Sequence, residues 1–317
     1  MLLLRKEEAL YYQQITTKGR KFQMSHYKLI SNYKHIDAYK NSFIELAKNV
    51  FGIDFEEWDQ NGAWNNDYIC YSFLDNNNII ANASINKMKI VLDGKEYQAI
   101  QIGTVMTHPD YRKQGLAAKL IKHILDEYEE SFDFIYLFAN DTVLDFYPKF
   151  GFKRIKENCY FLNLAENQYS NDRKSTIRAL KLDEQEDREL LKKLAKERVP
   201  ISTTCGVVDN EHLLMFYFIV FKEQTFYLEE EDLIVMYEVE GEDLHLYDVI
   251  SRNRINMGDI LSNILTSQIK KVHFHFTPDS IATSFDIQPS LSNDALFVNQ
   301  SWKDIKRDFV FPLTSHA

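Results

Sequence analysis

The segment between Tyr97 and Ala139 constrains the fold of this chain more than any other. It contains a strand that ends near Thr107, a loop with Pro109 and Gly115, a helix and a short apolar strand. The apolar residues of the helix fall on one face: Leu116, Leu120, Ile121, Ile124, Leu125 and Tyr128. A strand that returns to its sheet through a helix runs parallel to the strand it left. The sequence therefore predicts an α/β (α+β) fold with a mixed, partly parallel central sheet flanked by helices.

The second half of the chain repeats this order of elements. In the first half we predict strands at 27–31, 68–74, 79–90, 97–107 and 132–139, with helices from Asp37, from Gly115 and over 142–149. In the second half we predict strands from Thr176 and at 214–221, 233–239, 244–250 and 272–276, with helices over 183–198 and 257–265. We interpret the repeat as a diverged duplication.

The domain boundaries follow from the length and from one polar, turn-rich stretch. With 317 residues and roughly 150 residues per domain, two domains are expected. Residues 167–173 form the best linker. We therefore predict an N-terminal extension at 1–23, a first domain at 24–168 and a second domain at 174–317.

The composition argues against several classes of protein. The chain has 37 Lys and Arg against 47 Asp and Glu, a net charge of −10, whereas a nucleic-acid-binding protein needs a basic surface. Its three cysteines lie far apart and form no C-x-x-C motif, so neither a disulfide framework nor a metal site is expected. No apolar run approaches the roughly 18 residues that span a bilayer, and the apolar N-terminal run ends at Leu4. We expect a cytoplasmic chain without nucleic-acid or membrane partners.

The loop before the helix at Gly115 has the chemistry of a phosphate site. Its residues are Arg112, Lys113, Gln114, Gly115, Leu116 and Ala117. The first turn of a helix has unpaired backbone N–H groups and the positive end of the helix dipole. A glycine lets that backbone approach a pyrophosphate closely. The pattern is neither a P-loop nor a three-glycine dinucleotide fingerprint, and it implies no metal.

Two motifs together resemble the GNAT superfamily of N-acetyltransferases. The pattern R-x-x-G-x-A from Arg112 to Ala117, after the strand V-x-T-H-P, is similar to motif A of that superfamily. The pattern N-x6-Y-x3-G-F, formed by Asn140, Tyr147 and Gly151-Phe152, is similar to its motif B. The resemblance covers about residues 25–165. The whole chain looks like bacterial tandem GNAT proteins, in which a degenerate second GNAT domain follows an active one.

The resemblance implies transfer of an acetyl group from acetyl-CoA, the cosubstrate, to a primary amine of a small molecule. The residues that would contact acetyl-CoA are Arg112 through Ala117, by their backbone N–H groups, for the pyrophosphate, and Val105, Thr107 and Asn140 for the pantetheine arm and the thioester. Tyr147 would protonate the departing thiolate. The alternatives are an acetyltransferase for a protein or peptide amine, and a non-catalytic module that binds acyl-CoA.

The acceptor site and the general base stay open. Side chains that would line an acceptor pocket, or simply anchor their segments, are Trp64, Tyr71, Asn82 and Ser84, together with Trp58. The candidate bases are Asp67, Asp141, Glu57 and His108, and some GNAT proteins use no dedicated base. The C-terminus is apolar, so we expect it to be packed. If it reaches the cleft, His316 or the Ala317 carboxylate would act on the amine.

The second half lacks both motifs. At the matching place it reads S-R-N-R-I-N-M-G-D, without the required arginine–glycine spacing, so we predict one active site per chain. It also contains an acidic cluster: Glu229, Glu230, Glu231, Asp232, Glu238, Glu240, Glu242 and Asp243. The cluster would attract a basic acceptor if it faces the cleft, and it is otherwise a solvated edge. The oligomeric state stays open.

Overall fold

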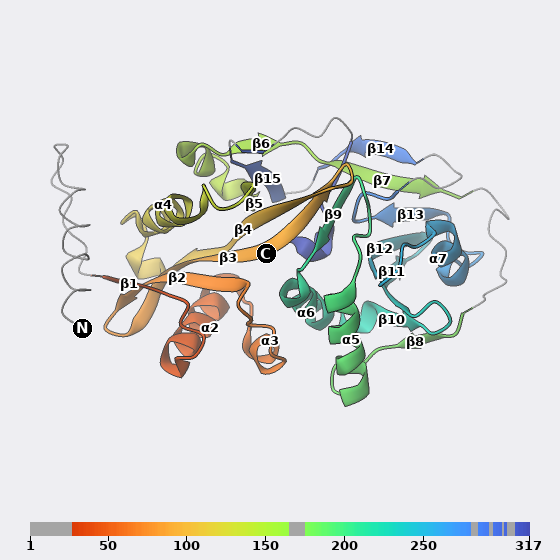
Figure 1. Ribbon diagram of the computed structural model, residues 1–317, viewed down its shortest axis with the longest axis horizontal. Helices are drawn as coiled ribbons and strands as arrows, with labels where there is room; N and C mark the ends of the chain where they lie inside the picture. Colours follow the sequence, from red (N-terminus) through yellow and green to blue (C-terminus); the bar gives the residue numbers. More distant parts are fainter. Residues whose placement is uncertain (1–26, 165–174, 280–284, 292–293, 300, 303–307) are drawn as a thin grey trace.

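The computed structural model contains two β-sheets that lie side by side (Figure 1). It describes residues 27–164, 175–279, 285–291, 294–299, 301–302 and 308–317. The predicted extension at 1–23 and the predicted linker at 167–173 lie outside the described residues. Both sheets combine parallel and antiparallel pairs and carry helices, so the predicted fold class is confirmed.

The first sheet is built around a long antiparallel pair and one parallel crossover. Its strands, in spatial order, are β1 (Lys28–Ser31), β2 (Tyr68–Asp75), β3 (Asn78–Leu92), β4 (Lys95–Thr107), β5 (Phe134–Asn140), β15 (Asp294–Val298) and β6 (Lys153–Ile155). Beyond the first residue of β2, the strand β9 (Cys205–Val208) pairs with the last residues of β3. Helix α4 (Leu116–Tyr128) connects β4 to the parallel β5 and packs on one face of the sheet. Helices α2 (Asp37–Phe51) and α3 (Glu56–Gln60) pack on the other face (Figure 1).

The second sheet repeats the crossover of the first. Its strands, in spatial order, are β14 (Asp286–Pro289), β7 (Asn158–Asn163), β13 (Lys271–Phe274), β12 (Asp243–Ile250), β11 (Leu233–Glu240), β10 (Thr225–Leu228) and β8 (Ile177–Ala179). Helix α7 (Met257–Ile264) connects β12 to the parallel β13, just as α4 connects β4 to β5. Both halves of the chain therefore contain an antiparallel hairpin followed by a helix and a parallel strand.

The two sheets exchange strands across the predicted domain boundary. Strand β7 precedes residue 168 but pairs with β13 and β14 in the second sheet. Strand β15 follows residue 174 but pairs with β5 and β6 in the first sheet. A cut at the linker would thus remove one strand from each sheet, and the predicted boundaries at 24–168 and 174–317 stay a prediction.

The predicted strand at 214–221 is wrong, because this segment is helix α6 (Glu211–Val220). Its sequence E-H-L-L-M-F-Y-F-I-V is apolar on nearly every side, and a short apolar run does not distinguish a buried strand from a buried helix. In the structure α6 packs against the aromatic core under α3, where the indole N–H of Trp58 donates to the backbone carbonyl of His212 at 2.7 Å. Burial on several sides explains why the helix shows no polar face.

The predicted helix at 142–149 is also wrong. The segment forms two short 3₁₀ turns, at Asp141–Val143 and Tyr147–Phe150. Pro148 lies within the second turn, and proline has no N–H to donate in an α-helix. Helix α5 (Gln185–Glu197), predicted at about 183–198, has Glu184 rather than Asp183 as its N-cap, one residue later than expected.

The C-terminal segment is packed, as the sequence predicts. Phe309 and Phe311 are buried, and the ring of Phe311 stacks on Tyr136 of β5. Further along, the hydroxyl of Thr314 donates to the carboxylate of Asp248, which also accepts two hydrogen bonds from the guanidinium of Arg198, each of 3.0 Å. All three polar side chains are buried, so this ion pair anchors the end of the chain inside the protein.

Asp248→Asn tests this anchor. The substitution leaves the buried guanidinium without a countercharge, so we expect the free energy of unfolding in urea to fall by about 3–5 kcal/mol. Thr314→Val is the control, because it removes one hydrogen bond to the carboxylate and keeps the ion pair. It should cost about 1.5–3 kcal/mol. Equal losses for the two variants would contradict a central role for the ion pair.

Candidate active site

Strands β4 and β5 pair along only part of their length. They are hydrogen-bonded from Ala99 and Phe134 to Ile102 and Leu137, although β4 continues to Thr107 and β5 to Asn140. The two strands therefore part and leave a fork between them. The predicted contact residues Val105 and Thr107 lie on the arm of β4 that has left β5, and both are half-buried. Their backbone groups on that side have no partner from β5, and the carbonyl of Thr107 instead accepts from the exposed side chain of Arg112 at 3.3 Å.

A bulge in β4 lies at the start of the fork. Between Gly103 and Met106, β4 contains one more residue than the facing part of β3. Thr104 has a φ of +49°, which a β-branched residue adopts only at a cost of about 1–3 kcal/mol. Two contacts hold it there: the amide of Asn82 donates to the carbonyl of Thr104 at 3.0 Å, and the hydroxyls of Tyr68 and Thr104 lie 3.1 Å apart. The bulge turns the following part of β4 away from β5.

The N-terminus of α4 is open to an anion. Gly115 precedes the helix with a φ of +74°, and no side chain caps the first turn. A methyl group on Gly115 would meet no atom within 4 Å, so the backbone is accessible. Arg112 and Lys113 are exposed beside it. The predicted phosphate loop thus has the free N–H groups and the positive charge that a pyrophosphate requires.

The matching helix of the second half is closed. The side chain of Asn256 caps α7 by accepting a hydrogen bond from the N–H of Gly258 at 2.9 Å. This side chain occupies the position at which a phosphate would bind a helix N-terminus. The capped helix agrees with the prediction that only the first half has a phosphate loop.

Tyr147 lies in the core formed by α4, β5 and β15. Its ring contacts Phe146, Phe152 and Phe297, and burial raises the pKa of its hydroxyl to about 12. The described residues provide no hydrogen-bond partner for this hydroxyl, which therefore remains a free donor at neutral pH. Asn140, at the end of β5, uses its side-chain oxygen to accept the N–H of Thr142 at 3.0 Å.

The end of the chain reaches the fork, on the face opposite α4. A methyl group on Gly103 would lie 2.8 Å from Cβ of Ala317 and 3.0 Å from its carboxyl carbon. The ring of His316 stacks on Phe138 of β5 with a centroid distance of 3.5 Å, and Tyr217 of α6 donates to the carbonyl of His316 at 3.1 Å. Burial lowers the pKa of His316 to about 3, so the imidazole is neutral. Ala317 is therefore the residue of this segment that lies against Gly103 at the fork.

Sequence reasoning does not single out Gly103. The signal that could have found it is a glycine inside a strand, since such a glycine often marks the close approach of another backbone. The sequence contains that signal, but only the fold shows that the approaching backbone is the C-terminus.

The predicted acceptor residues do not form one wall. Ser84 lies opposite Gly103 in the β3–β4 register, and Asn82 donates to Ser84 at 2.9 Å, so these two lie beside the fork. Trp64 is buried in the aromatic core with Trp58. Tyr71 lies on the opposite face of the sheet, where its hydroxyl donates to Glu127 at 2.8 Å. Side chains an odd number of residues apart on β2 point to opposite faces, so Tyr68 and Tyr71 lie on different sides of the sheet. Trp64 belongs to the same core as Tyr68. Trp64 and Tyr71 therefore cannot line the same pocket.

The four candidate bases make contacts away from Gly103. Glu57 on α3 and Asp141 after β5 are exposed. His108 caps a 3₁₀ turn by accepting the N–H of Asp110 at 3.3 Å. Burial raises the pKa of Asp67. Its backbone carbonyl accepts a hydrogen bond from the N–H of Lys87, in a part of β3 that does not face Gly103. None of these contacts directs a carboxylate or an imidazole to Gly103.

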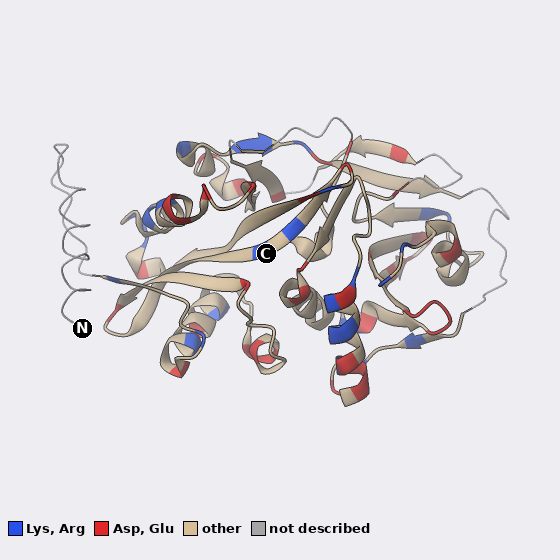
Figure 2. Cartoon of the chain, viewed as in Figure 1, with Lys and Arg blue, Asp and Glu red and all other residues tan. Residues whose placement is uncertain are grey.

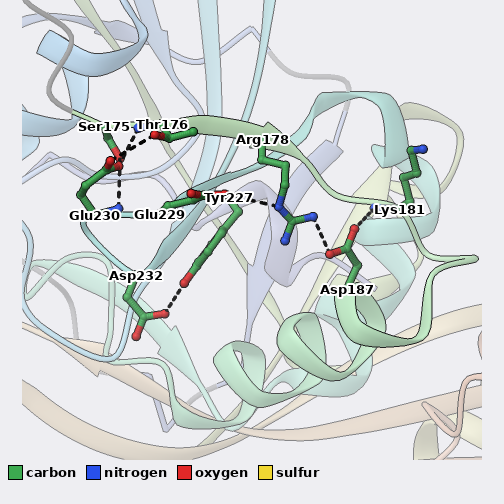
Figure 3. A network of polar contacts seen from close by, with 9 residues as sticks. All are labelled: Ser175, Thr176, Arg178, Lys181, Asp187, Tyr227, Glu229, Glu230 and Asp232. Carbon is green, nitrogen blue, oxygen red and sulfur yellow. Dashed lines mark hydrogen bonds and ion pairs between the residues drawn. The ribbon is translucent and has the colours of Figure 1, made fainter.

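Half of the acidic cluster holds the second sheet together. Figure 3 shows the carboxylate of Glu230 accepting hydrogen bonds from Ser175 and Thr176, and the guanidinium of Arg178 between Asp187 and Glu229. Figure 2 shows this acidic turn between β10 and β11 at the outer side of the second sheet, far from the C-terminus. Among the rest of the cluster, Glu242 pairs with Lys270. The turn from Glu229 to Asp232 therefore does not line the fork.

The described residues contain no group of three or more His, Cys, Asp or Glu side chains arranged to hold a metal ion. Within the same residues, no helix is both long enough and apolar enough to cross a bilayer.

Comparison with known proteins identifies the first half. Residues 32–155 match the family model described as an acetyltransferase (GNAT) domain, and this range contains the fork, the loop at Gly115 and Tyr147. The chain contains a GNAT acetyltransferase domain. N-alpha-acetyltransferase 50 of Danio rerio is 42% identical to this chain over 57 residues, which are 16% of this chain and 34% of that protein. The chain therefore spans about a third of the length of this curated relative.

Solved structures share the fold over both halves. A probable N-acyltransferase from Enterococcus faecalis is 15% identical, with a TM-score of 0.57 over 86% of this chain and 72% of that one. A GCN5-related N-acetyltransferase from Kribbella flavida is 14% identical, with a TM-score of 0.54 over 86% and 71%. Eis1 from Mycobacterium abscessus is 13% identical, with a TM-score of 0.52 over 86% and 74%. The likeness extends beyond the GNAT domain into the second sheet.

Gly103→Ala tests the position of the chain end in the GNAT domain. The added methyl group would overlap Ala317, so we expect this segment to be displaced from the fork and kcat for an amine acceptor to fall about tenfold or more. The free energy of unfolding should fall by about 1–3 kcal/mol, because the contacts of Thr314 and His316 hold Ala317 against β4. Gly258→Ala in α7 is the matched control and should keep kcat. An unchanged kcat for Gly103→Ala would show that the chain end plays no part in transfer.

Proposed function

We propose that this protein transfers the acetyl group of acetyl-CoA to a primary amine of a small molecule. The observation that carries the proposal is the fork between β4 and β5, which lies directly before the uncapped N-terminus of α4 within the GNAT domain. A ligand that binds at both features would have a thioester at one end and a pyrophosphate further along. The use of acetyl-CoA fits a cytoplasmic chain.

The residues present fit acetyl-CoA in two places. The N–H groups of the loop from Arg112 to Ala117 would bind the pyrophosphate, supported by the helix dipole. The free edge of β4 at Val105 and Thr107 would bind the pantetheine arm and polarise the thioester carbonyl, and Asn140 would contact the arm from β5. The bound thioester supplies the acetyl group, and no metal takes part in this proposal.

Two proton movements accompany the transfer. The acceptor amine attacks only when neutral, and the general base that would take its proton stays open. Tyr147 would donate to the departing thiolate. Because burial raises its pKa to about 12, full transfer to a thiolate of pKa about 8.5 is uphill by roughly 4–5 kcal/mol. The phenol would therefore act first as a hydrogen-bond donor to the developing charge.

A protein or peptide amine is the alternative acceptor. The likeness to N-alpha-acetyltransferase 50 over 57 residues favours it. The C-terminal segment favours a small molecule, because His316 and Ala317 cover the face of the fork opposite α4 and reduce the room beside Gly103. A panel of small amines and peptides, assayed by release of the CoA thiol, separates the two.

We also propose that the second half is a duplicated GNAT-like unit that has lost its phosphate site. The repeated crossover through α7 and the cap on that helix by Asn256 support this. Its α6 packs beside the fork, so the second half would shape the acceptor site. The oligomeric state stays open.

Calorimetric titration with acetyl-CoA tests the proposed cosubstrate. We expect one site per chain with a Kd well below about 1 mM, and weaker binding at higher salt, because Arg112 and Lys113 face a polyanion. Absence of binding at millimolar acetyl-CoA would refute the proposed function. Binding without turnover across the whole panel would instead favour the non-catalytic module.

Tyr147→Phe tests the proposed acid. We expect kcat to fall by about 10²-fold or more, while Kd for acetyl-CoA stays within about twofold. The fold should be preserved, because the hydroxyl has no partner to lose. Tyr136→Phe is the matched control in another part of the core, where the hydroxyl contacts the sulfur of Met88 at 3.0 Å. An unchanged kcat for Tyr147→Phe would remove this residue from the mechanism.

A further inference from the structure

Asn82 is fully buried beside the fork, and both polar atoms of its amide are hydrogen-bonded. Its oxygen accepts from the hydroxyl of Ser72 at 2.8 Å. Its nitrogen donates to the hydroxyl of Ser84 at 2.9 Å and to the backbone carbonyl of Thr104 at 3.0 Å. A carbonyl only accepts, so the amide must direct its nitrogen to Thr104 and its oxygen to Ser72. Both N–H groups of Asn82 are therefore used within the protein.

The hydrogen bonds behind Asn82 run in one direction. Ser72 has a single hydroxyl proton, which it donates to Asn82. The hydroxyl of Tyr33 lies 2.7 Å from that of Ser72 and must then be the donor of this pair. Burial raises the pKa of Tyr33 well above its ordinary value, so the proton is present at neutral pH. Tyr33, Ser72 and Asn82 thus form a chain of donors that ends at Thr104, and such bonds strengthen one another.

The carbonyl of Thr104 fixes the direction of the next N–H group. The peptide between Thr104 and Val105 is trans and planar, so the N–H of Val105 points away from Asn82. Asn82 lies on β3 opposite Ser72, on the face where Cys70 packs beside α2 and α3. The N–H of Val105 is therefore directed to the side of β4 that β5 has left and toward the face that carries α4.

The rotation of this peptide is not set by strand pairing. Neither Thr104 nor Val105 has a partner in the register with β3 or with β5. The φ of +49° at Thr104 is also one that a β-branched residue disfavours, so the residue would leave it if it were free to do so. The hydrogen bonds from Asn82 and Tyr68 therefore hold the peptide in its orientation.

We propose that Asn82, supported by Tyr33 and Ser72, positions the N–H of Val105 to polarise the thioester carbonyl of acetyl-CoA. Negative charge develops on that oxygen as the amine attacks, and a donor stabilises it best when the protein holds the donor in place beforehand. Asn82 and Tyr33 are positioning residues, which act on the reaction through one peptide group. The inference rests on the proposed function, because it assigns residues to the polarising step of that reaction.

The first test examines the free chain by NMR. A residue with positive φ has a short distance between its amide and α protons, which gives a strong nuclear Overhauser effect within the residue. With labelled threonine, and with Thr104 assigned by its loss in Thr104→Gly, we expect this signal to weaken in Asn82→Leu as φ becomes negative. Asn263→Leu is the matched control, because Asn263 is also buried and bonded through both amide atoms but lies in α7.

The second test measures the polarisation itself. Infrared difference spectra of bound acetyl-CoA, with and without ¹³C at the thioester carbonyl, isolate the stretch of that carbonyl. A hydrogen bond lowers its frequency, so we expect a lower value in the wild-type complex than in free acetyl-CoA. In Asn82→Leu the frequency should return toward the free value, while Kd for acetyl-CoA stays within about threefold, because the loop at Gly115 still binds the pyrophosphate.

Kinetics supply the third readout. With an amine acceptor, kcat should fall about 10- to 100-fold in Asn82→Leu and about two- to fivefold in Tyr33→Phe, with KM for the amine nearly unchanged. Glycine adopts a positive φ without steric cost, so a glycine at position 104 depends less on Asn82. Adding Thr104→Gly to Asn82→Leu should therefore recover kcat to within about fivefold of the wild type. Lost packing around Asn82 predicts no such recovery.

Three results would overturn the proposal. They are an unchanged Thr104 signal in Asn82→Leu, an unchanged carbonyl frequency, and a loss of activity confined to KM for the amine, which would make Asn82 a substrate contact. If urea unfolding shows that Asn82→Leu does not fold, Tyr33→Phe decides by the same readouts, because it removes only the first donor. A chain that binds no acetyl-CoA would refute the proposed function alone, since the NMR signal of the free chain still decides whether Asn82 holds the peptide.

Discussion

The carboxylate of Asp248 on β12 binds the guanidinium of Arg198 and the hydroxyl of Thr314 in the protein interior. Removing either charge would leave the other buried without a countercharge, so the three side chains form one unit. Through Thr314 this unit fixes the last residues of the chain, which lie against β4 and β5. The position of this segment beside the fork of the first sheet thus depends on an ion pair formed in the second half of the chain.

The fork itself depends on a local strain that its neighbours sustain. Thr104 would relax from its positive φ if the amide of Asn82 and the hydroxyl of Tyr68 did not bind it. The side chain of Asn82 and the hydroxyl of Tyr68 are buried polar groups, and their hydrogen bonds to Thr104 hold the bulge in place. The strained residue and its supports lie where the free edge of β4 begins, which is the pattern expected of a functional site.

The exchange of β7 and β15 makes the two halves interdependent. Each sheet borrows a strand from the other half, and α6 packs its apolar surface against the aromatic core around Trp58. The face of the fork opposite α4 is therefore built from both halves, although the GNAT domain lies in the first. This arrangement explains how a second half whose α7 is capped by Asn256 still contributes to the site, through Tyr217 and the C-terminal segment.

The sequence by itself determined the crossover from β4 through α4 to β5, the loop at Gly115 and the family of the first half, because these features are local and periodic. It also indicated that the apolar C-terminus is packed. Only the tertiary structure decided that α6 is a helix, since burial on several sides removes the polar face that would have identified it. The tertiary structure likewise decided which side chains meet at the fork. Gly103 meets Ala317 and Tyr217 meets His316 across about two hundred and about one hundred residues of chain, and no local pattern encodes contacts of that range. Chain topology brings these residues together, and burial then keeps the imidazole of His316 neutral.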